Sequence, residues 1–211
     1  MMKIEIWSDY VCPFCYIGKR KLALALEKTS MKENVEIIFH SFELDPNAKK
    51  SYAENMNQLI AKKYGMSMEQ AVAANNNIIN VAKEVGLVFN FANLKPTNTF
   101  DAHRLSHYAK EQGQLQAYTE AVMKSYFTDS LNISDFSVLT SIAVAVGLDQ
   151  AKTLGILESS AFADAVRQDE ANAHSRQING VPYFLFNDQE SINGAQAVET
   201  FIAVIEGLKK A

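Results

Sequence analysis

Two cysteines three residues apart carry the clearest chemical signal in this chain. The motif C-P-F-C at residues 12–15 contains both cysteines of the 211 residues. It follows a strand-like run over residues 3–8 and opens a helix-like run that extends to about Thr29. A C-x-x-C pair at the point where a strand passes into a helix is typical of a redox-active dithiol.

The start of a helix favours a reactive thiol at Cys12. Unpaired N–H groups and a partial positive charge at a helix N-terminus stabilise a thiolate. Free cysteine titrates near pH 8.5, and such settings lower this to about 3.5–7.5. Pro13 suits the first helical position, where its missing N–H leaves no intrahelical bond unmade. We therefore expect Cys12 to be the exposed, attacking thiol and Cys15, about one turn below, to be the shielded, resolving thiol.

Composition and charge are those of an ordinary globular protein, with 48% hydrophobic residues, 21% charged residues and a net charge of −4. The negative charge argues against nucleic-acid binding. We expect no membrane span, because no window approaches 18 apolar residues. We also expect no signal peptide, because the first strand begins by Lys3. These features predict a cytoplasmic protein, where a cysteine pair is more often catalytic or metal-binding than structural.

Strand-like segments lie at both ends of the chain, with helices between them. Strands are predicted over residues 3–8, 35–40, 183–186 and 191–193. Helical segments are predicted over about 13–29, 56–64, 67–85, 98–112, 115–127, 134–146, 149–178 and 195–209. The residues predicted to start helices are Ser67, Ser134, Asp149 and Ser160, the last two both within the segment 149–178. The order predicts one mixed sheet from residues 1–50 and 179–211, with residues 51–178 inserted as an all-helical domain.

A proline stands just before the third predicted strand, in Gly180-Val181-Pro182-Tyr183. Cis peptide bonds are largely confined to X–Pro, so Pro182 is a candidate for one. A trans turn proline is the alternative. Because of the cysteine pair, we predict the cis form.

Four segments, in order along nearly the whole chain, resemble the DsbA-like thioredoxin family. They are DYVCPFCYIGK at residues 9–19, FELDP at 42–46, NTFDAHR at 98–104 and GVP at 180–182. The resemblance is to the branch of FrnE-like proteins, close to 2-hydroxychromene-2-carboxylate isomerases and kappa-class glutathione transferases. It implies an α/β thioredoxin fold with an inserted all-helical domain, and dithiol–disulfide chemistry at Cys12 and Cys15.

The resemblance also implies where a substrate lies. Pro182 completes the catalytic set in a loop that faces the cysteines, and Val181 offers its backbone to an extended substrate. The other expected substrate contacts are aromatic, inserted-domain and loop residues: Phe14, Tyr183, His103, Gly194 and Gln196. Glutathione would lie along Val181 and Pro182, with its γ-glutamyl end near Gly194 and Gln196.

Two positions, Ile6 and Cys12, depart from what some relatives carry, and Asp9 bears on the reactivity of the thiol. Many thioredoxin relatives have a buried acid where this chain has Ile6, six residues before the first cysteine. Asp9 lies closer, and a carboxylate that faces the thiol would oppose thiolate formation. The isomerases and kappa-class transferases use serine in place of Cys12, so the cysteine here favours redox chemistry.

A metal site is an alternative that the sequence supports weakly. His103 and His107 share a helix face, but the H-E-x-x-H pattern is missing because Arg104 follows His103. A zinc site on Cys12 and Cys15 would need two further ligands. We therefore expect no metal.

Three functions fit these observations. The first is a cytosolic thiol–disulfide oxidoreductase, in which the Cys12–Cys15 pair is the redox centre and no separate cofactor is needed. The second is a glutathione-dependent isomerase or transferase acting on a small aromatic molecule. The third is a non-catalytic, chaperone-like binding module. The expected partners are a thiol- or disulfide-bearing protein or small molecule, with glutathione as a candidate co-substrate, in a monomer or homodimer that binds neither nucleic acid nor membrane.

Overall fold

A four-stranded mixed sheet is built from the two ends of the chain, in a computed structural model that describes residues 1–210. The strand order is β2-β1-β3-β4. β1 (Met2–Ser8) pairs parallel with β2 (Val35–Ser41) and antiparallel with β3 (Tyr183–Phe186), which pairs antiparallel with β4 (Glu190–Asn193). The predicted α/β class and mixed sheet are confirmed.

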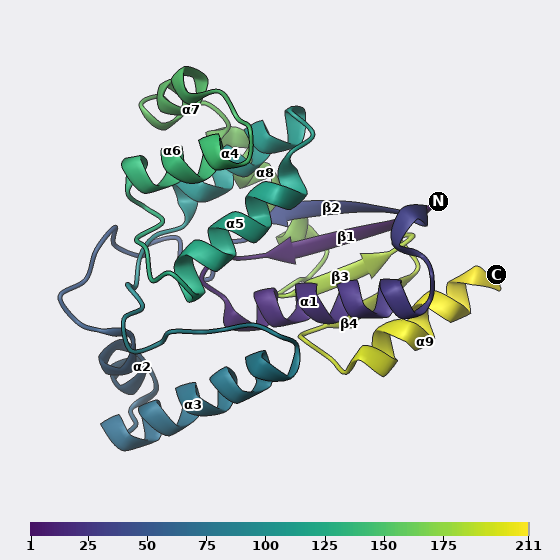
Figure 1. Cartoon of the computed structure of the whole chain (residues 1–211), viewed down its shortest axis with the longest axis horizontal. Helices are drawn as coiled ribbons and strands as arrows, with labels where there is room; N and C mark the ends of the chain where they lie inside the picture. The colour runs from purple at the N-terminus through teal and green to yellow at the C-terminus, as the bar shows by residue number, and fades with distance from the viewer. Residues whose placement is uncertain (211) are drawn as a thin grey trace. The chain divides into compact units, whose positions relative to one another are not determined.

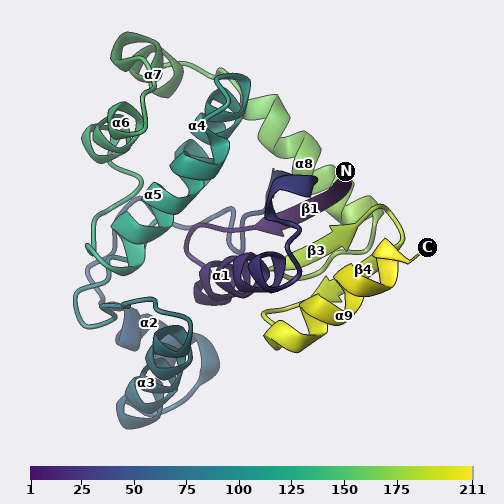
Figure 2. The same cartoon turned by 45° about the vertical axis from the view of Figure 1, so that its right-hand side comes forward.

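Two helices cover one face of this sheet. α1 (Pro13–Lys28) and α9 (Val198–Lys209) lie side by side there (Figures 1 and 2). Their apolar residues pack on inward-facing strand residues in one buried cluster: Met2, Ile4, Ile6, Leu22, Ala25, Leu26, Phe184, Phe186, Ile192, Phe201 and Ile205. Each large apolar side chain buried in this way contributes about 1.5–3 kcal/mol. The cluster fixes α1, and with it the cysteine motif at the N-terminus of α1.

The opposite face of the sheet carries a smaller apolar cluster. Side chains alternate along a strand, so Trp7 points away from Ile4 and Ile6. It packs with Leu185 of β3, with Ile178 and with Ala173 of α8 (Ala163–Ser175).

The inserted region is helical, as predicted. Besides α8, its helices are α2 (Met56–Tyr64), α3 (Met68–Glu84), α4 (Phe100–Glu111), α5 (Leu115–Phe127), α6 (Phe136–Ala145) and α7 (Gln150–Leu157). Outside this region, a short 3₁₀ turn, η1 (Lys32–Asn34), precedes β2. The chain divides into two compact units, one formed by residues 1–44 with the segment from Gln168, the other by residues 45–167. The domain limits of 50 and 179 stay a prediction.

Three helix limits differ from those expected. Asp135, not Ser134, caps α6: its carboxylate accepts the Ser137 N–H at 2.8 Å, whereas the Ser134 hydroxyl donates to the Lys50 carbonyl. The helical stretch predicted over 149–178, with starts at Asp149 and Ser160, consists of two helices. Asp149 caps α7, whereas α8 begins at Ala163 and not at Ser160, after Phe162, where φ is +62°.

The last helix begins at Val198, not near Ala195. Gly194 has a φ of +78°, and the Gln196 N–H donates to the Gly194 carbonyl, so a turn precedes the helix. By contrast, the capping box of Ser67 with Gln70 is present as predicted. Within residues 1–210, every helix falls short of the length and apolar character needed to cross a membrane.

Candidate active site

Cys12 is the N-cap residue of α1, and Pro13 follows as the first helical residue. The Cys12 N–H donates to the Asp9 carbonyl at 3.2 Å, and the Cys15 N–H donates to the Cys12 carbonyl at 3.1 Å. Both cysteines are free thiols. The turn therefore presents Cys12 at the positive end of the helix dipole, with Cys15 within the first helical turn.

The loop before β3 meets this turn. The Val181–Pro182 peptide bond is cis, as predicted. The Cys12 thiol donates to the Val181 carbonyl, with the sulfur and oxygen 3.6 Å apart. The Pro182 carbonyl accepts the Gly194 N–H at 2.8 Å. Cys12, Val181 and Pro182 thus form one site, although 169 residues separate Cys12 from Val181.

Gly18 lets α1 approach this loop closely. A Cβ at this position would lie 3.0 Å from Cζ of Phe184 and 3.1 Å from Cγ of Pro182. Both distances are shorter than ordinary van der Waals contacts between carbon atoms. A side chain at Gly18 would therefore push the helix and the cis-proline loop apart.

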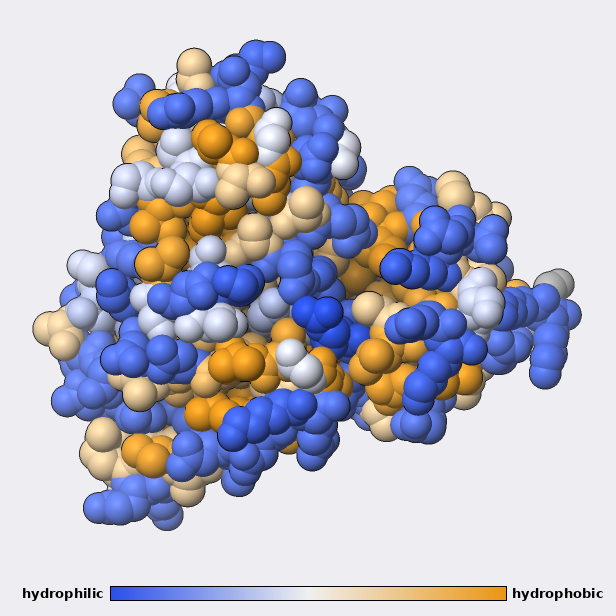
Figure 3. Space-filling model, viewed as in Figure 1, coloured by the Kyte–Doolittle hydropathy of each residue, from blue (hydrophilic) through white to orange (hydrophobic). Residues whose placement is uncertain are grey.

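Both sulfurs are shielded from solvent. The exposed fraction of Cys12 is 4% and that of Cys15 is 1%. The expectation that Cys12 would be exposed is therefore wrong, because its thiol turns inward to the Val181 carbonyl. The neighbouring Phe14 side chain is 44% exposed, and hydrophobic residues reach the surface in several places on the face shown in Figure 3.

Cys15 differs from Cys12 in its electrostatic surroundings. Burial raises the pKa of the Cys15 thiol well above its usual range, and the adjacent Cys12 raises it further. Hydrogen bonds from the Ser8 hydroxyl and the Asp9 N–H lower it in part, the latter with nitrogen and sulfur 3.5 Å apart. Cys15 is consequently a neutral thiol at pH 7.

Asp9 organises the loop after β2. It is 1% exposed, and its Oδ2 accepts the Leu44 N–H at 2.8 Å. The sequence suggested Asp9 only as a carboxylate that would oppose a thiolate. Its contacts show a positioning role: the backbone holds Cys12 and Cys15, and the side chain holds residue 44.

The other predicted contact residues lie in two places. Tyr183 opens β3 and meets Trp7 edge-on, with ring centroids 6.0 Å apart. The Gln196 side chain donates to the Asn193 carbonyl at 2.9 Å in the turn that contains Gly194. His103 lies on α4 in the 45–167 unit and is 3% exposed. The roles of these residues toward a substrate stay predictions.

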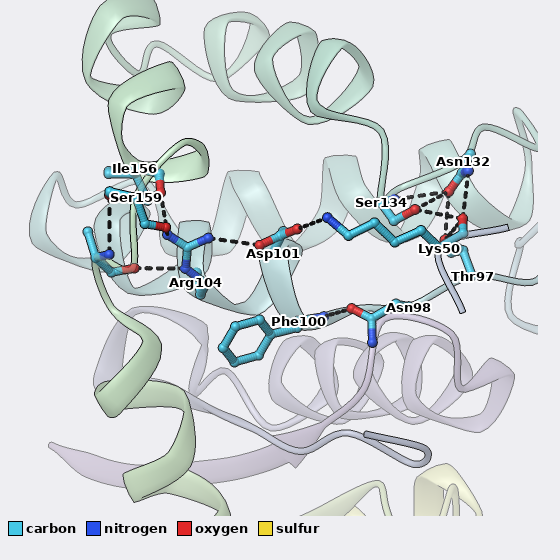
Figure 4. Close-up of polar contacts among 11 residues, drawn as sticks. Lys50, Thr97, Asn98, Phe100, Asp101, Arg104, Asn132, Ser134, Ile156 and Ser159 are labelled. Carbon is cyan, nitrogen blue, oxygen red and sulfur yellow. Dashed lines mark hydrogen bonds and ion pairs between the residues drawn. The ribbon is translucent and has the colours of Figure 1, made fainter. Parts of the chain in front are cut away.

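The family-like segment 98–104 forms a polar network inside the helical unit (Figure 4). Arg104, 3% exposed, donates to the carbonyls of Ile156, Ser159 and Ala161 and to the Asp101 carboxylate. Asp101 also pairs with Lys50 at 3.0 Å. Arg104 therefore ties α4 to the connection between α7 and α8, and its role is structural.

A second buried polar cluster lies on the face of the sheet that carries Trp7. The His40 ring stacks on Trp7 with centroids 4.5 Å apart. Its Nε2 lies 3.0 Å from Glu5, and its Nδ1 lies 2.8 Å from Asp169. This cluster was not predicted from the sequence; the available signal was that Trp7 and His40 occupy matching positions in adjacent strands.

Glu5 is ionised more readily than a free glutamate. Burial raises the pKa of its carboxyl, but hydrogen bonds from Lys3 and His40 outweigh this and hold the pKa below its usual range. Among the residues that the structure describes, no three His, Cys, Asp or Glu side chains gather in a way that could hold a metal ion.

Comparisons with known proteins agree with this architecture. A model of the DSBA-like thioredoxin domain matches residues 3–206. The protein YwbO of Bacillus subtilis (strain 168) is 32% identical over 209 residues, which cover 98% of this chain and 97% of YwbO. The crystal structure of the probable DsbA oxidoreductase SCO1869 from Streptomyces coelicolor matches with a TM-score of 0.93 and 37% identity, over 97% of this chain and 88% of that one.

A more distant match has the same fold. The cytosolic disulfide reductase DsbM from Pseudomonas aeruginosa, in its structure with GSH, aligns with a TM-score of 0.70 over 99% of this chain and all of its own. The identity is 12%, so this likeness concerns the fold alone.

Proposed function

We propose that this chain, which belongs to the DSBA-like thioredoxin domain family, is a thiol–disulfide oxidoreductase that works through Cys12 and Cys15. The observation that carries the proposal is the meeting of Cys12, at the start of α1, with the Val181 carbonyl beside the cis-Pro182 bond. A dithiol at that position can form a mixed disulfide and then an internal disulfide.

The two thiols act in sequence. Cys12, as a thiolate, attacks one sulfur of a substrate disulfide; a Cys12–substrate S–S bond forms, and the other substrate sulfur leaves as a thiolate. Cys15 then loses its proton and attacks Cys12 Sγ, so that the Cys12–Cys15 bond forms and the second substrate thiolate leaves and is protonated. The protein dithiol is oxidised and the substrate disulfide is reduced; the same steps in reverse oxidise a substrate dithiol.

The raised pKa of Cys15 supports this order. A neutral Cys15 does not compete with Cys12 for the incoming disulfide. Once Cys12 is bonded to the substrate, it no longer raises the pKa of the Cys15 thiol, so Cys15 ionises more readily and can act as the nucleophile. We assign the nucleophilic role to Cys12, the resolving role to Cys15 and the backbone alignment of the substrate to Val181 and Pro182.

The substrate contacts belong to the same proposal. We assign them to Phe14 between the two cysteines, to Tyr183 after cis-Pro182, to the turn of Gly194 and Gln196, and to His103 of α4. We place the chain in the FrnE-like branch, acting in the cytoplasm on disulfide-bearing proteins or small molecules. Glutathione is the thiol we expect to recycle the Cys12–Cys15 disulfide; the match to the DsbM structure with GSH supports this choice at the level of the fold.

A glutathione redox titration, read by alkylation and mass spectrometry, tests the proposal. We expect a reversible Cys12–Cys15 disulfide. A potential near −270 mV would indicate a reductant, and one near −120 mV an oxidant. A lasting glutathione adduct on Cys12 with no internal disulfide would contradict the dithiol mechanism and favour glutathione-dependent chemistry.

Paired cysteine variants test the two roles separately. Cys12→Ser should abolish disulfide exchange, whereas Cys15→Ser should still react once and accumulate mixed disulfides. A Cys12→Ser variant with full exchange activity would contradict the assignment of the nucleophile.

A further inference from the structure

Cys15 must become an anion in a place that water does not reach. Its exposed fraction is 1%, and the resolution step requires its thiolate. An isolated buried charge is strongly unfavourable unless nearby groups donate hydrogen bonds to it. The structure therefore has to supply such donors to the Cys15 sulfur.

Two donors come from consecutive residues. The Asp9 N–H donates to Cys15 Sγ at 3.5 Å. The Ser8 side chain lowers the pKa of the same thiol through its hydrogen-bonding hydroxyl. Ser8 ends β1 and is 6% exposed. It lies on the face of β1 that also presents Ile4 and Ile6 to α1, because side chains alternate along a strand.

Asp9 is held in place from both ends. Its carbonyl accepts the Cys12 N–H, and its carboxylate accepts the Leu44 N–H. These contacts hold Asp9 in place, with its N–H directed to the Cys15 sulfur. Donors that are fixed before the reaction stabilise charge that develops during it.

We infer that the Ser8 hydroxyl and the Asp9 N–H form a donor pair that stabilises the Cys15 thiolate during resolution of the mixed disulfide, with Ser8 as a catalytic residue. The inference rests on the proposed function, because resolution by Cys15 belongs to that mechanism. The strand that leads to the cysteines carries Ile6, not an acid, six residues before Cys12. The hydrogen bonds to the Cys15 sulfur come from neutral donors at the end of β1.

The test uses 5,5′-dithiobis(2-nitrobenzoate) with the reduced full chain in stopped flow. Attack by Cys12 releases one thionitrobenzoate and leaves a mixed disulfide. Resolution by Cys15 breaks that bond, forms Cys12–Cys15 and releases a second thionitrobenzoate. The two phases therefore report the two cysteines separately.

Ser8→Ala should slow the second phase about tenfold at pH 7 and move its pH profile upward by roughly one unit, because the Cys15 thiolate loses one hydrogen bond and sulfur is a weak acceptor. The first phase should stay within about twofold of the parent rate. Ser8→Thr keeps the hydroxyl and should restore the second phase, whereas Ser8→Val, of similar size, should not.

Ser41→Ala is the matched control. Ser41 ends β2, is the register partner of Ser8 and is 3% exposed, so its substitution also removes a buried hydroxyl at a strand end. It should leave both phases unchanged. A second phase in Ser8→Ala within about twofold of the parent, or an equal slowing in Ser41→Ala, would overturn the inference. If Ser8→Ala does not fold, the Thr and Val variants decide the point.

The outcomes separate the inference from the proposed function. A parent protein that releases only one thionitrobenzoate would contradict resolution by Cys15, and with it the proposed function. Two phases in the parent with no effect of Ser8→Ala or Ser8→Val would leave the proposed function intact and overturn the donor pair alone.

Discussion

Replacing Gly18 with alanine should weaken the contact between α1 and the cis-proline loop. The added Cβ would meet Phe184 at 3.0 Å and Pro182 at 3.1 Å. Forcing a methyl group into a packed core costs about 1–3 kcal/mol. Against this, alanine in place of glycine favours a helix by about 0.5–1 kcal/mol. The free energy of unfolding should therefore fall by up to about 2.5 kcal/mol.

Gly207 in α9 provides the matched control. Within the described part of the chain, a Cβ at Gly207 meets no heavy atom within 4 Å. Gly207→Ala should gain the helix contribution alone and stabilise the protein by about 0.5–1 kcal/mol. Because this contribution cancels between the two variants, their difference of about 1–3 kcal/mol measures the contact at Gly18.

Urea unfolding, followed by the emission of the chain's single tryptophan, is the assay. Trp7 lies in the same compact unit as Gly18 and Gly207, so the signal reports the unit that both variants perturb. Parent and variants should share one m-value and differ in midpoint. A Gly18→Ala protein as stable as Gly207→Ala would refute the argument from close approach.

Further predictions concern three buried groups. Arg104→Met should lower the free energy of unfolding by about 3 kcal/mol, because three carbonyls lose a hydrogen-bond donor and the buried Asp101 carboxylate loses one of its cationic partners. Urea unfolding followed by circular dichroism measures this loss, and a loss under about 1 kcal/mol would contradict the network's structural role. The carboxyl of Glu5, whose pKa is lowered in the folded state, stabilises the protein above its unfolded pKa of about 4.3 and stops doing so as pH falls below that value. Between pH 5 and pH 3, the parent should therefore lose more stability than Glu5→Gln, and parallel pH profiles would contradict this. The raised pKa of the Cys15 thiol has the opposite effect on the pH dependence of stability, because above pH 9.0 the thiol ionises in the unfolded chain but not in the folded one. As pH rises above 9.0, the reduced parent should therefore lose stability that Cys15→Ala retains, and thermal unfolding in the presence of reductant measures this.

Much of the fold follows from local sequence features. Alternating apolar residues marked β1, and a continuous apolar run marked β3. The capping box of Ser67 with Gln70 fixed the start of α3. Errors occurred where two residues competed for one role. Ser134 and Asp135 can both cap a helix, and only the long-range bond from Ser134 to the Lys50 carbonyl decides between them.

The reactive residues of the candidate site could be predicted from the sequence, but their contacts in the folded protein could not. Cys12, Cys15 and the cis bond before Pro182 follow from spacing, strand position and resemblance. The inward turn of the Cys12 thiol does not, because it depends on a carbonyl 169 residues away. Ser8 and Asp9 were not predicted as partners of Cys15 for a similar reason. Whether the end of β1 faces the Cys15 sulfur depends on how β1 packs against α1, which the sequence pattern does not specify.

The sheet is assembled from segments far apart in the chain, and this has a consequence during synthesis. The Lys3 N–H donates to the Asn187 side chain, 184 residues further on, whereas residues 45–167 form a contiguous compact unit. A ribosome adds about 5–20 residues per second, so β1 waits roughly 10–40 s for β3 to be made. The helical insertion can fold in that interval, while Cys12 and Cys15 remain on an unfinished sheet. The reactive thiols are thus translated early and enclosed late, open to oxidants and chaperones until the last strands emerge.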